Sequence, residues 1–130
     1  FLLIREAIKN NILITCLPVP TAFVPALVMS GLPSDSFIFE GFLPRKKGRK
    51  SKLYEISQNT KTTILYESPF RIIKTLSDMK ETIGSDRKIA IVREISKIYE
   101  EVFRGTIEEA ILEYNERTMK GEFVICIDKA

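Results

Sequence analysis

Apolar positions along the chain follow two spacings, which predict a mixture of helices and strands. Apolar residues three or four apart predict helices over residues 1–10, 21–30, 68–83 and 106–117, and another around 53–56. Short apolar or alternating runs predict strands over residues 12–17, 37–42, 62–66, 88–92, 101–104 and 121–128. Helices and strands alternate, with a hairpin-like pair around Gly105. This order predicts an α/β fold with a mixed sheet of about five strands flanked by helices.

Proline, glycine and capping residues mark the ends of several elements. Pro18 and Pro20 fix their own backbone angles, so we expect a rigid extended turn before the second helix. Gly31 should end that helix. Thr106 and Glu109 have the spacing of a capping box at the start of the last helix. Ser68 and the proline after it predict the start of the helix over 68–83.

The composition is typical of a soluble globular domain, with 45% hydrophobic and 28% charged residues. No apolar run approaches the roughly 18 residues that a membrane helix needs, and no signal-peptide pattern is present. Cys16 and Cys126 lie in apolar runs, so we expect two buried free thiols. These features predict a cytoplasmic protein. Because the chain starts at Phe1 in the middle of an amphipathic pattern, we expect it to be part of a longer protein.

The charges and the missing histidine limit the possible chemistry. The chain has no histidine, which excludes histidine as a base or metal ligand in these residues, and we expect no metal site. The formal net charge is only +3, but six cations fall within eight positions. This basic cluster consists of Arg45, Lys46, Lys47, Arg49, Lys50 and Lys52. Phosphate backbones attract such segments, so we expect contact with nucleic acid; the alternative is a solvated loop. No aromatic residue interleaves with the cations, so the cluster itself does not indicate base stacking.

Three candidate sites lie at ends of predicted strands, where ligands gather in α/β folds. The turn at residues 17–22 opens a helix whose free N–H groups could face a ligand, although a plain chain reversal explains the local pattern better. Glu67 could line a site, stabilise the start of the next helix, or do both. If the two strands ending at residues 67 and 93 are neighbours, Glu67, Arg71, Arg93 and Glu94 share one rim. That rim could be a polar site or only a solvated ion-pair network.

Five sequence segments, several of which contain the candidate residues, occur in a fixed order along the chain. They are the run GLPSDSFIFEGFLPRK at residues 31–46 and the shorter segments 66–71, 92–94, 104–106 and 121–123. In order and approximate spacing they resemble the small-subunit ribosomal RNA 2′-O-ribose methyltransferases of the tetrapyrrole (corrin/porphyrin) methylase superfamily. The match runs from about Leu17 to the end of the chain. Several motifs in order make this resemblance more specific than any one of them.

The resemblance implies a methyltransferase with two α/β domains and S-adenosylmethionine in the cleft between them. Residues 1–16 would be the end of a truncated N-terminal domain, and residues 17–130 a C-terminal domain of the tetrapyrrole methylase type. The substrate would be a cytidine ribose 2′-hydroxyl in 16S RNA of the small ribosomal subunit, and the enzyme a homodimer. The resemblance also implies that the chain alone is inactive, because the missing N-terminal domain carries the glycine-rich cofactor loops.

The resemblance also implies residue roles. The cofactor-binding residues would be Pro18, Pro20, Thr21, Ala22, Tyr66, Glu67, Glu122 and Phe123. From their charge, the basic cluster together with Arg71 and Arg93 are the expected RNA-binding residues. Two positions depart from the family pattern. Val19 stands where glycine is usual, and valine allows fewer backbone conformations at that position than glycine does. Phe70 replaces a usual histidine, which removes a polar role but leaves a ring that can pack or stack.

Methyl transfer from a sulfonium is a direct displacement, so the attacking oxygen, methyl carbon and sulfur must be aligned. A ribose hydroxyl is a poor nucleophile, and a base is expected. The candidates are Glu67 and Glu94, oriented by Arg71 or Arg93, unless the missing domain supplies the base. Two other functions stay open: methylation of a tetrapyrrole ring carbon, and a non-catalytic RNA-binding module.

Overall fold

The structure, a computed structural model, describes residues 2–130. Helices and strands alternate along them, as the apolar spacing predicts. The elements in chain order are α1 (Leu2–Lys9), α2 (Phe23–Ser30), β1 (Phe37–Phe42), α3 (Arg49–Ser57), β2 (Thr62–Glu67), α4 (Ile72–Ile83), β3 (Lys88–Arg93), β4 (Glu101–Thr106), α5 (Ile107–Tyr114) and β5 (Phe123–Ile127).

The strands form one mixed sheet in the order β1-β2-β5-β3-β4, which confirms the predicted fold class. β1 and β2 are parallel, whereas β5 is antiparallel to β2 on one side and to β3 on the other. β2 and β3 therefore run in the same direction, and their last residues lie at the same edge of the sheet. Glu67 and Arg93 are both register partners of Phe123, the first residue of β5. Two strand ends and one strand start thus meet at this edge.

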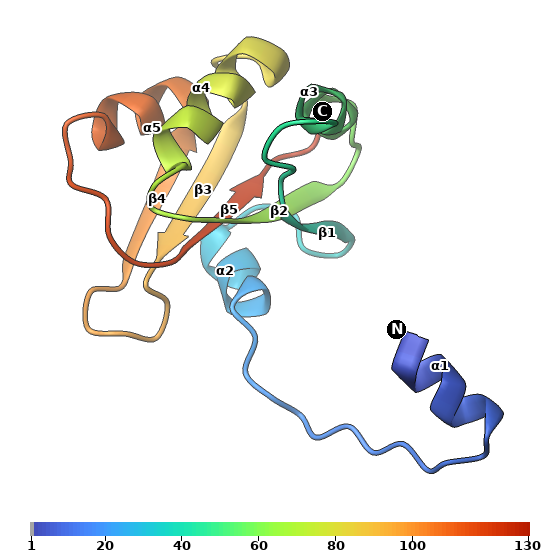
Figure 1. The fold of residues 1–130 in the computed structure, drawn as a ribbon. Helices are drawn as coiled ribbons and strands as arrows, with labels where there is room; N and C mark the ends of the chain where they lie inside the picture. The colour runs from blue at the N-terminus through green and yellow to red at the C-terminus, as the bar shows by residue number, and fades with distance from the viewer. Residues whose placement is uncertain (1) are drawn as a thin grey trace.

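Helices cover both faces of the sheet (Figure 1). The side chains of β5 alternate between the two faces, as they must in a strand. Phe123, Ile125 and Ile127 belong to the larger core under α3, α4 and α5. Val124 and Cys126 belong to the smaller core under α2. All five are buried, so β5 is the central strand that holds the two layers together.

Two predicted helix termini are confirmed and one is wrong. Gly31 ends α2 in the left-handed conformation, with φ 71°. The Thr106 side chain accepts a hydrogen bond from the Glu109 N–H, and the Glu109 carboxylate accepts one from the Thr106 N–H, so the capping box is present. The predicted start of a helix at Ser68 is wrong. Residues 68–71 form a turn, and α4 begins at Ile72.

The predicted strand at residues 12–17 does not form. Residues 12–20 are exposed and have no regular structure, and α1 lies apart from the sheet (Figure 1). An apolar run becomes a buried strand only beside another strand, and within residues 2–130 none pairs with it. The prediction of a buried thiol is accordingly wrong for Cys16, which is exposed, and right for Cys126. Among the described residues, no helix combines the length and apolar character needed to cross a membrane.

Candidate functional site

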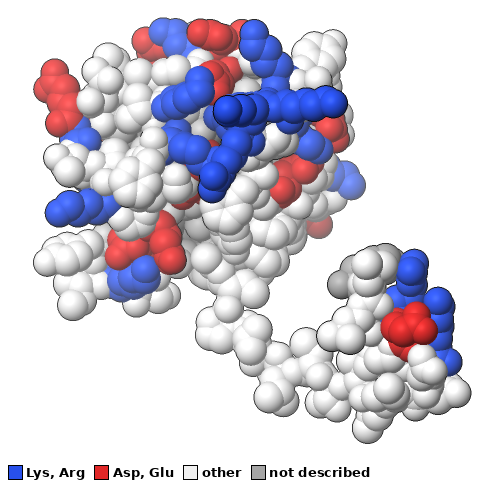
Figure 2. Space-filling view, in the orientation of Figure 1, with Lys and Arg blue, Asp and Glu red and all other residues white. Residues whose placement is uncertain are grey.

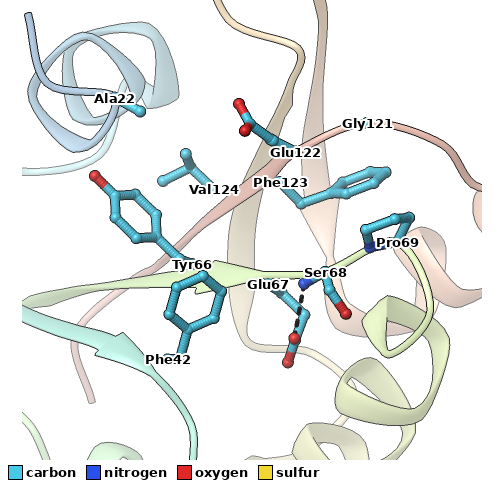
Figure 3. A pocket seen from close by; sticks show the side chains of 10 residues that line it. All are labelled: Ala22, Phe42, Tyr66, Glu67, Ser68, Pro69, Gly121, Glu122, Phe123 and Val124. Carbon is cyan, nitrogen blue, oxygen red and sulfur yellow. Dashed lines mark hydrogen bonds between the residues drawn. The ribbon is translucent and has the colours of Figure 1, made fainter.

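A pocket of about 450 Å³ lies at the sheet edge where β2 ends and β5 begins. Its walls come from the start of α2, the end of β1, the end of β2 with the turn after it, and the start of β5 (Figure 3). We call it the sheet-edge pocket. The residues that line it are Ala22, Phe42, Tyr66, Glu67, Ser68, Pro69, Gly121, Glu122, Phe123 and Val124.

The structure brings together most of the residues that the sequence analysis assigned to the cofactor. Ala22, Tyr66, Glu67, Glu122 and Phe123 all line the sheet-edge pocket. They come from three separate parts of the chain, so their meeting depends on the sheet order. The pocket lies beyond the carboxyl end of β2, where ligands collect in folds of this class.

Three residues predicted at the cofactor site do not line this pocket. Pro18, Pro20 and Thr21 lie in the exposed segment before α2. The N-cap position of α2 is Ala22, and no side-chain hydrogen bond is made there. Conversely, Phe42 lines the pocket and was missed. It ends β1, the strand parallel to β2, so knowledge of that pairing would have found it.

Aromatic rings form one wall of the sheet-edge pocket. The Tyr66 ring lies 5.7 Å from the Phe42 ring and 5.1 Å from the Phe39 ring, centre to centre. Phe39 in turn stacks on Phe23 of α2 at 4.6 Å. These contacts hold the Tyr66 ring in place, so the wall is preformed. An apolar, preformed wall of this kind suits a flat heteroaromatic group.

Glu67 holds the turn that follows β2. Its carboxylate accepts hydrogen bonds from the Ser68 N–H at 2.8 Å and the Thr75 hydroxyl at 2.7 Å, and pairs with Arg71 at 2.8 Å. The side chain is only 1% exposed. Figure 3 shows the carboxylate turned toward Ser68, away from the Tyr66 ring. These contacts describe a positioning group, and the catalytic role of Glu67 stays a prediction.

A buried chain of polar contacts joins Glu67 to the basic cluster. Arg49 donates to Thr75 Oγ1 at 2.8 Å, and the same hydroxyl donates to Glu67. Arg49 also donates to Asp78 Oδ2 at 2.7 Å and to the Pro44 carbonyl at 3.3 Å. Burial alone would raise the pKa of Asp78, but the hydrogen bonds from Arg49 and Lys74 outweigh it and lower that pKa. The network ties α3 and α4 to the end of β2.

Glu94 supports the other side of the pocket. Its carboxylate accepts from the Glu122 N–H at 2.9 Å and pairs with Lys97 at 3.0 Å. The hydrogen bonds from Lys97 and from the Glu122 backbone hold the pKa of Glu94 below its usual range. A general base works best with a pKa near the working pH, so this environment favours a structural role. The catalytic role of Glu94 also stays a prediction.

The condition for one shared rim of charges is not met, because β5 lies between β2 and β3. Glu67 pairs with Arg71 on the β2 side. On the β3 side, Arg93 pairs with Glu101 at 3.3 Å and donates to the Lys120 carbonyl at 2.7 Å. The assumption that the two strands are neighbours was wrong, and the four charges form separate clusters.

The basic cluster divides into structural and exposed cations. Arg49 is 7% exposed and serves the network around Thr75. Lys52 is half-buried and pairs with Glu40 at 3.1 Å and with Glu55 at 2.9 Å. These contacts argue against direct RNA binding by either residue. The exposed cations are Arg45, Lys46, Lys47 and Lys50. Figure 2 shows Lys and Arg side chains gathered over the upper part of the sheet domain, where α3 and α4 lie in Figure 1.

A second pocket, of about 620 Å³, adjoins the first. Phe42 and Ser68 line both. We call it the Phe70 pocket, and its other lining residues are Leu43, Arg45, Phe70 and Arg71. It therefore lies between the sheet-edge pocket and the first residue of the basic cluster.

Residues 1–111 match the family model of the tetrapyrrole (corrin/porphyrin) methylases. The chain belongs to this family. Among related tetrapyrrole methylases, the chain is 45% identical over 127 residues to "Ribosomal RNA small subunit methyltransferase I" of Halalkalibacterium halodurans, covering 97% of the chain and 44% of the relative. It is 42% identical over 120 residues to the protein of the same name from Synechocystis, covering 92% and 43%. The chain thus spans less than half the length of these two relatives.

Solved tetrapyrrole methylases share the fold. The structure of the methyltransferase CobJ has a TM-score of 0.68 at 18% identity, over 98% of this chain and 56% of that one. Uroporphyrin-III C-methyltransferase from Thermus thermophilus, solved with S-adenosylhomocysteine, has a TM-score of 0.57 at 16% identity, over 95% and 56%. The fold and family expected from the spaced motifs are confirmed.

Proposed function

We propose that the chain is part of an S-adenosylmethionine-dependent methyltransferase that methylates a cytidine ribose 2′-hydroxyl in 16S ribosomal RNA. The observation that carries this proposal is the sheet-edge pocket, whose walls contain five residues of the cofactor set. The adjoining Phe70 pocket is lined by Arg45, the first of the four exposed cations of the basic cluster. The names of the relatives support ribosomal RNA as the substrate.

The lining of the sheet-edge pocket fits one side of the cofactor. The Tyr66 ring offers apolar surface to an adenosine, and the buried Phe123 and Val124 line the pocket beside it, together with Ala22. The Glu122 carboxylate is 83% exposed and can accept hydrogen bonds from hydroxyl or ammonium groups. When bound, S-adenosylmethionine supplies the methyl group. The residues of this chain hold it from one side and shield it from water.

The other side of the cleft belongs, in this proposal, to a preceding domain. Residues 1–16 would be its last part and residues 17–130 the C-terminal domain. The exposure of apolar side chains in α1 and after it supports this division, because Leu3 is 80% and Leu13 89% exposed. We further propose that the complete protein is a cytoplasmic homodimer, and that this chain alone is inactive.

Within the reaction, we assign Glu67 and Glu94 to positioning. Glu67 orders the turn at residues 68–71, and Glu94 orders the start of β5. The base that accepts the ribose proton would then come from the preceding domain. Glu67→Gln and Glu94→Gln in the complete protein should lower turnover without changing the shape of its pH profile. Loss of the acidic limb of that profile in either variant would show that the carboxylate is the general base after all.

The test of the proposed function is methyl transfer by the complete protein. Labelled S-adenosylmethionine is incubated with small ribosomal subunits or with a porphyrinoid, and the RNA is digested to nucleosides. We expect label in 2′-O-methylcytidine and none in the porphyrinoid. Label in the porphyrinoid alone would favour tetrapyrrole methylation. RNA binding without any cofactor binding in a calorimetric titration would favour a non-catalytic RNA-binding module.

A further inference from the structure

Phe70 is an aromatic residue without a place in the core. Its side chain is 94% exposed, although large apolar residues nearby in the sequence, such as Ile72, are completely buried. It lies in the turn between β2 and α4, which Glu67 and Arg71 hold in place. The ring is therefore presented to solvent from an ordered turn. Exposed aromatic rings of this kind are typical of binding surfaces.

The surroundings of Phe70 combine aromatic rings with cations. Phe42, 60% exposed, lines the same pocket from the end of β1. Arg45 follows Phe42 in the same segment and is exposed, and Arg71 lines the pocket from the turn that carries Phe70. Proteins that hold single-stranded nucleic acid use this combination, with rings that stack on bases and cations that follow the phosphates. The basic cluster contains no aromatic residue, and the fold supplies the rings from elsewhere in the chain.

We propose that the Phe70 pocket binds a nucleobase of single-stranded RNA, with the base stacked on the Phe70 ring. Arg45 and the exposed lysines after it then lie against the flanking phosphates. This inference rests on the proposed function, whose substrate it describes in more detail. It makes Phe70 a substrate-binding residue.

The position of the pocket supports a base at or next to the methylated nucleotide. The Phe70 pocket and the sheet-edge pocket share Phe42 and Ser68 as lining residues. A nucleotide whose base lies in the Phe70 pocket therefore has its ribose close to the sheet-edge pocket, where the methyl donor is proposed to bind. An unpaired nucleotide fits this arrangement, because a stacked and paired base would not reach an isolated ring.

Phe70→Ala in the complete protein tests the stacking contact. Since the ring is almost fully exposed, its removal should leave folding intact. Loss of one stacked base should raise KM for RNA by about tenfold, while KM for S-adenosylmethionine stays the same and Phe70→Tyr retains most of the affinity. Leu112→Ala is the matched control, because Leu112 is an apolar residue of α5 that is 72% exposed. Equal KM values for RNA in Phe70→Ala and Leu112→Ala would overturn the inference.

Phe70→Trp gives a direct readout of stacking. The chain contains no tryptophan, so the fluorescence difference between this variant and the unaltered protein reports on position 70. A single-stranded RNA oligonucleotide containing the target cytidine should quench this signal, and the same oligonucleotide with an abasic site there should not. Equal quenching by both would overturn the inference.

The inference and the proposed function fail in distinguishable ways. If the unaltered protein methylates RNA and the Phe70 variants behave like the Leu112 control, the inference is wrong and the proposed function survives. If the base-dependent quenching occurs in the Phe70→Trp variant but the unaltered protein transfers no methyl group to RNA, the base-binding pocket is supported and the proposed function is overturned.

Discussion

Arg49→Met is expected to destabilise the protein, although Arg49 lies in a segment whose composition suggests only RNA binding. The substitution keeps a long unbranched side chain but removes the guanidinium. That group makes hydrogen bonds to Asp78, Thr75 and the Pro44 carbonyl, at 2.7, 2.8 and 3.3 Å. Its side chain is 9% exposed, so water cannot replace these bonds without opening the structure.

The expected loss is about 3 kcal/mol. Removing one partner of a buried ion pair costs about 3–5 kcal/mol, because the other charge is left uncompensated. Asp78 keeps Lys74 at 3.4 Å and is 24% exposed on its side chain, which places the cost at the lower end. Since a domain is stable by about 5–15 kcal/mol in total, this loss should be easy to measure. The neighbouring Lys50 is exposed, and Lys50→Met should change stability by less than about 0.5 kcal/mol.

Urea unfolding followed by circular dichroism measures both variants under the same conditions. We expect a lower midpoint with an unchanged slope for Arg49→Met, and the midpoint of the unaltered protein for Lys50→Met. RNA affinity should fall more in Lys50→Met than in Arg49→Met, and the affinity of Lys50→Met should depend less on salt concentration. If Arg49→Met unfolds at the same urea concentration as the unaltered protein, the structural role assigned to Arg49 is refuted.

Three further substitutions test local features by the same unfolding assay. Gly121→Ala should lower the free energy of unfolding by about 1–2 kcal/mol, because Gly121 has φ +93° and a new Cβ would lie 2.5 Å from the Glu94 side chain. Adding Glu94→Ala to this variant should relieve the contact but not the backbone strain. Tyr114→Phe should not destabilise the protein, since the buried hydroxyl has no partner among the described residues, and a loss above about 1 kcal/mol would contradict this. Hydrogen bonds from Arg117 lower the pKa of Glu101, so the stability that Glu101 contributes is present above its usual pKa and disappears as the pH falls through the lowered one. Glu101→Gln should therefore cost about 1 kcal/mol at pH 7 and progressively less as the pH falls through the lowered pKa, and a cost that does not change with pH would contradict the pairing.

Elements with a complete local signal could be predicted from the sequence. The capping box at Thr106 depends only on neighbouring residues and is confirmed. The strand at 37–42 is also confirmed, because β2 is present to pair with it. The run at residues 12–17 has the same apolar character as a buried strand. It forms none, because strand formation needs a partner strand that local pattern cannot supply.

The part of the candidate site that the spaced family motifs form could be predicted from the sequence. Tyr66, Glu122 and Phe123 meet as the resemblance implied. Contacts that depend on strand order were not predictable, since no local signal places β5 between β2 and β3. For the same reason the sequence did not reveal that Phe42 and Phe70 lie in one pocket with Arg45.

Calorimetric titration of the complete protein with S-adenosylhomocysteine tests whether the sheet-edge pocket is a wall of the cofactor site. Ala22→Phe places a ring in the pocket without removing any core side chain, and Val28→Phe adds the same ring at a position of α2 where the native residue is 73% exposed. We predict that Ala22→Phe weakens binding by about tenfold or more, because the ring occupies space that the ligand needs. Val28→Phe should bind like the unaltered protein. Equal affinity in both variants would contradict the assignment of this pocket to the cofactor.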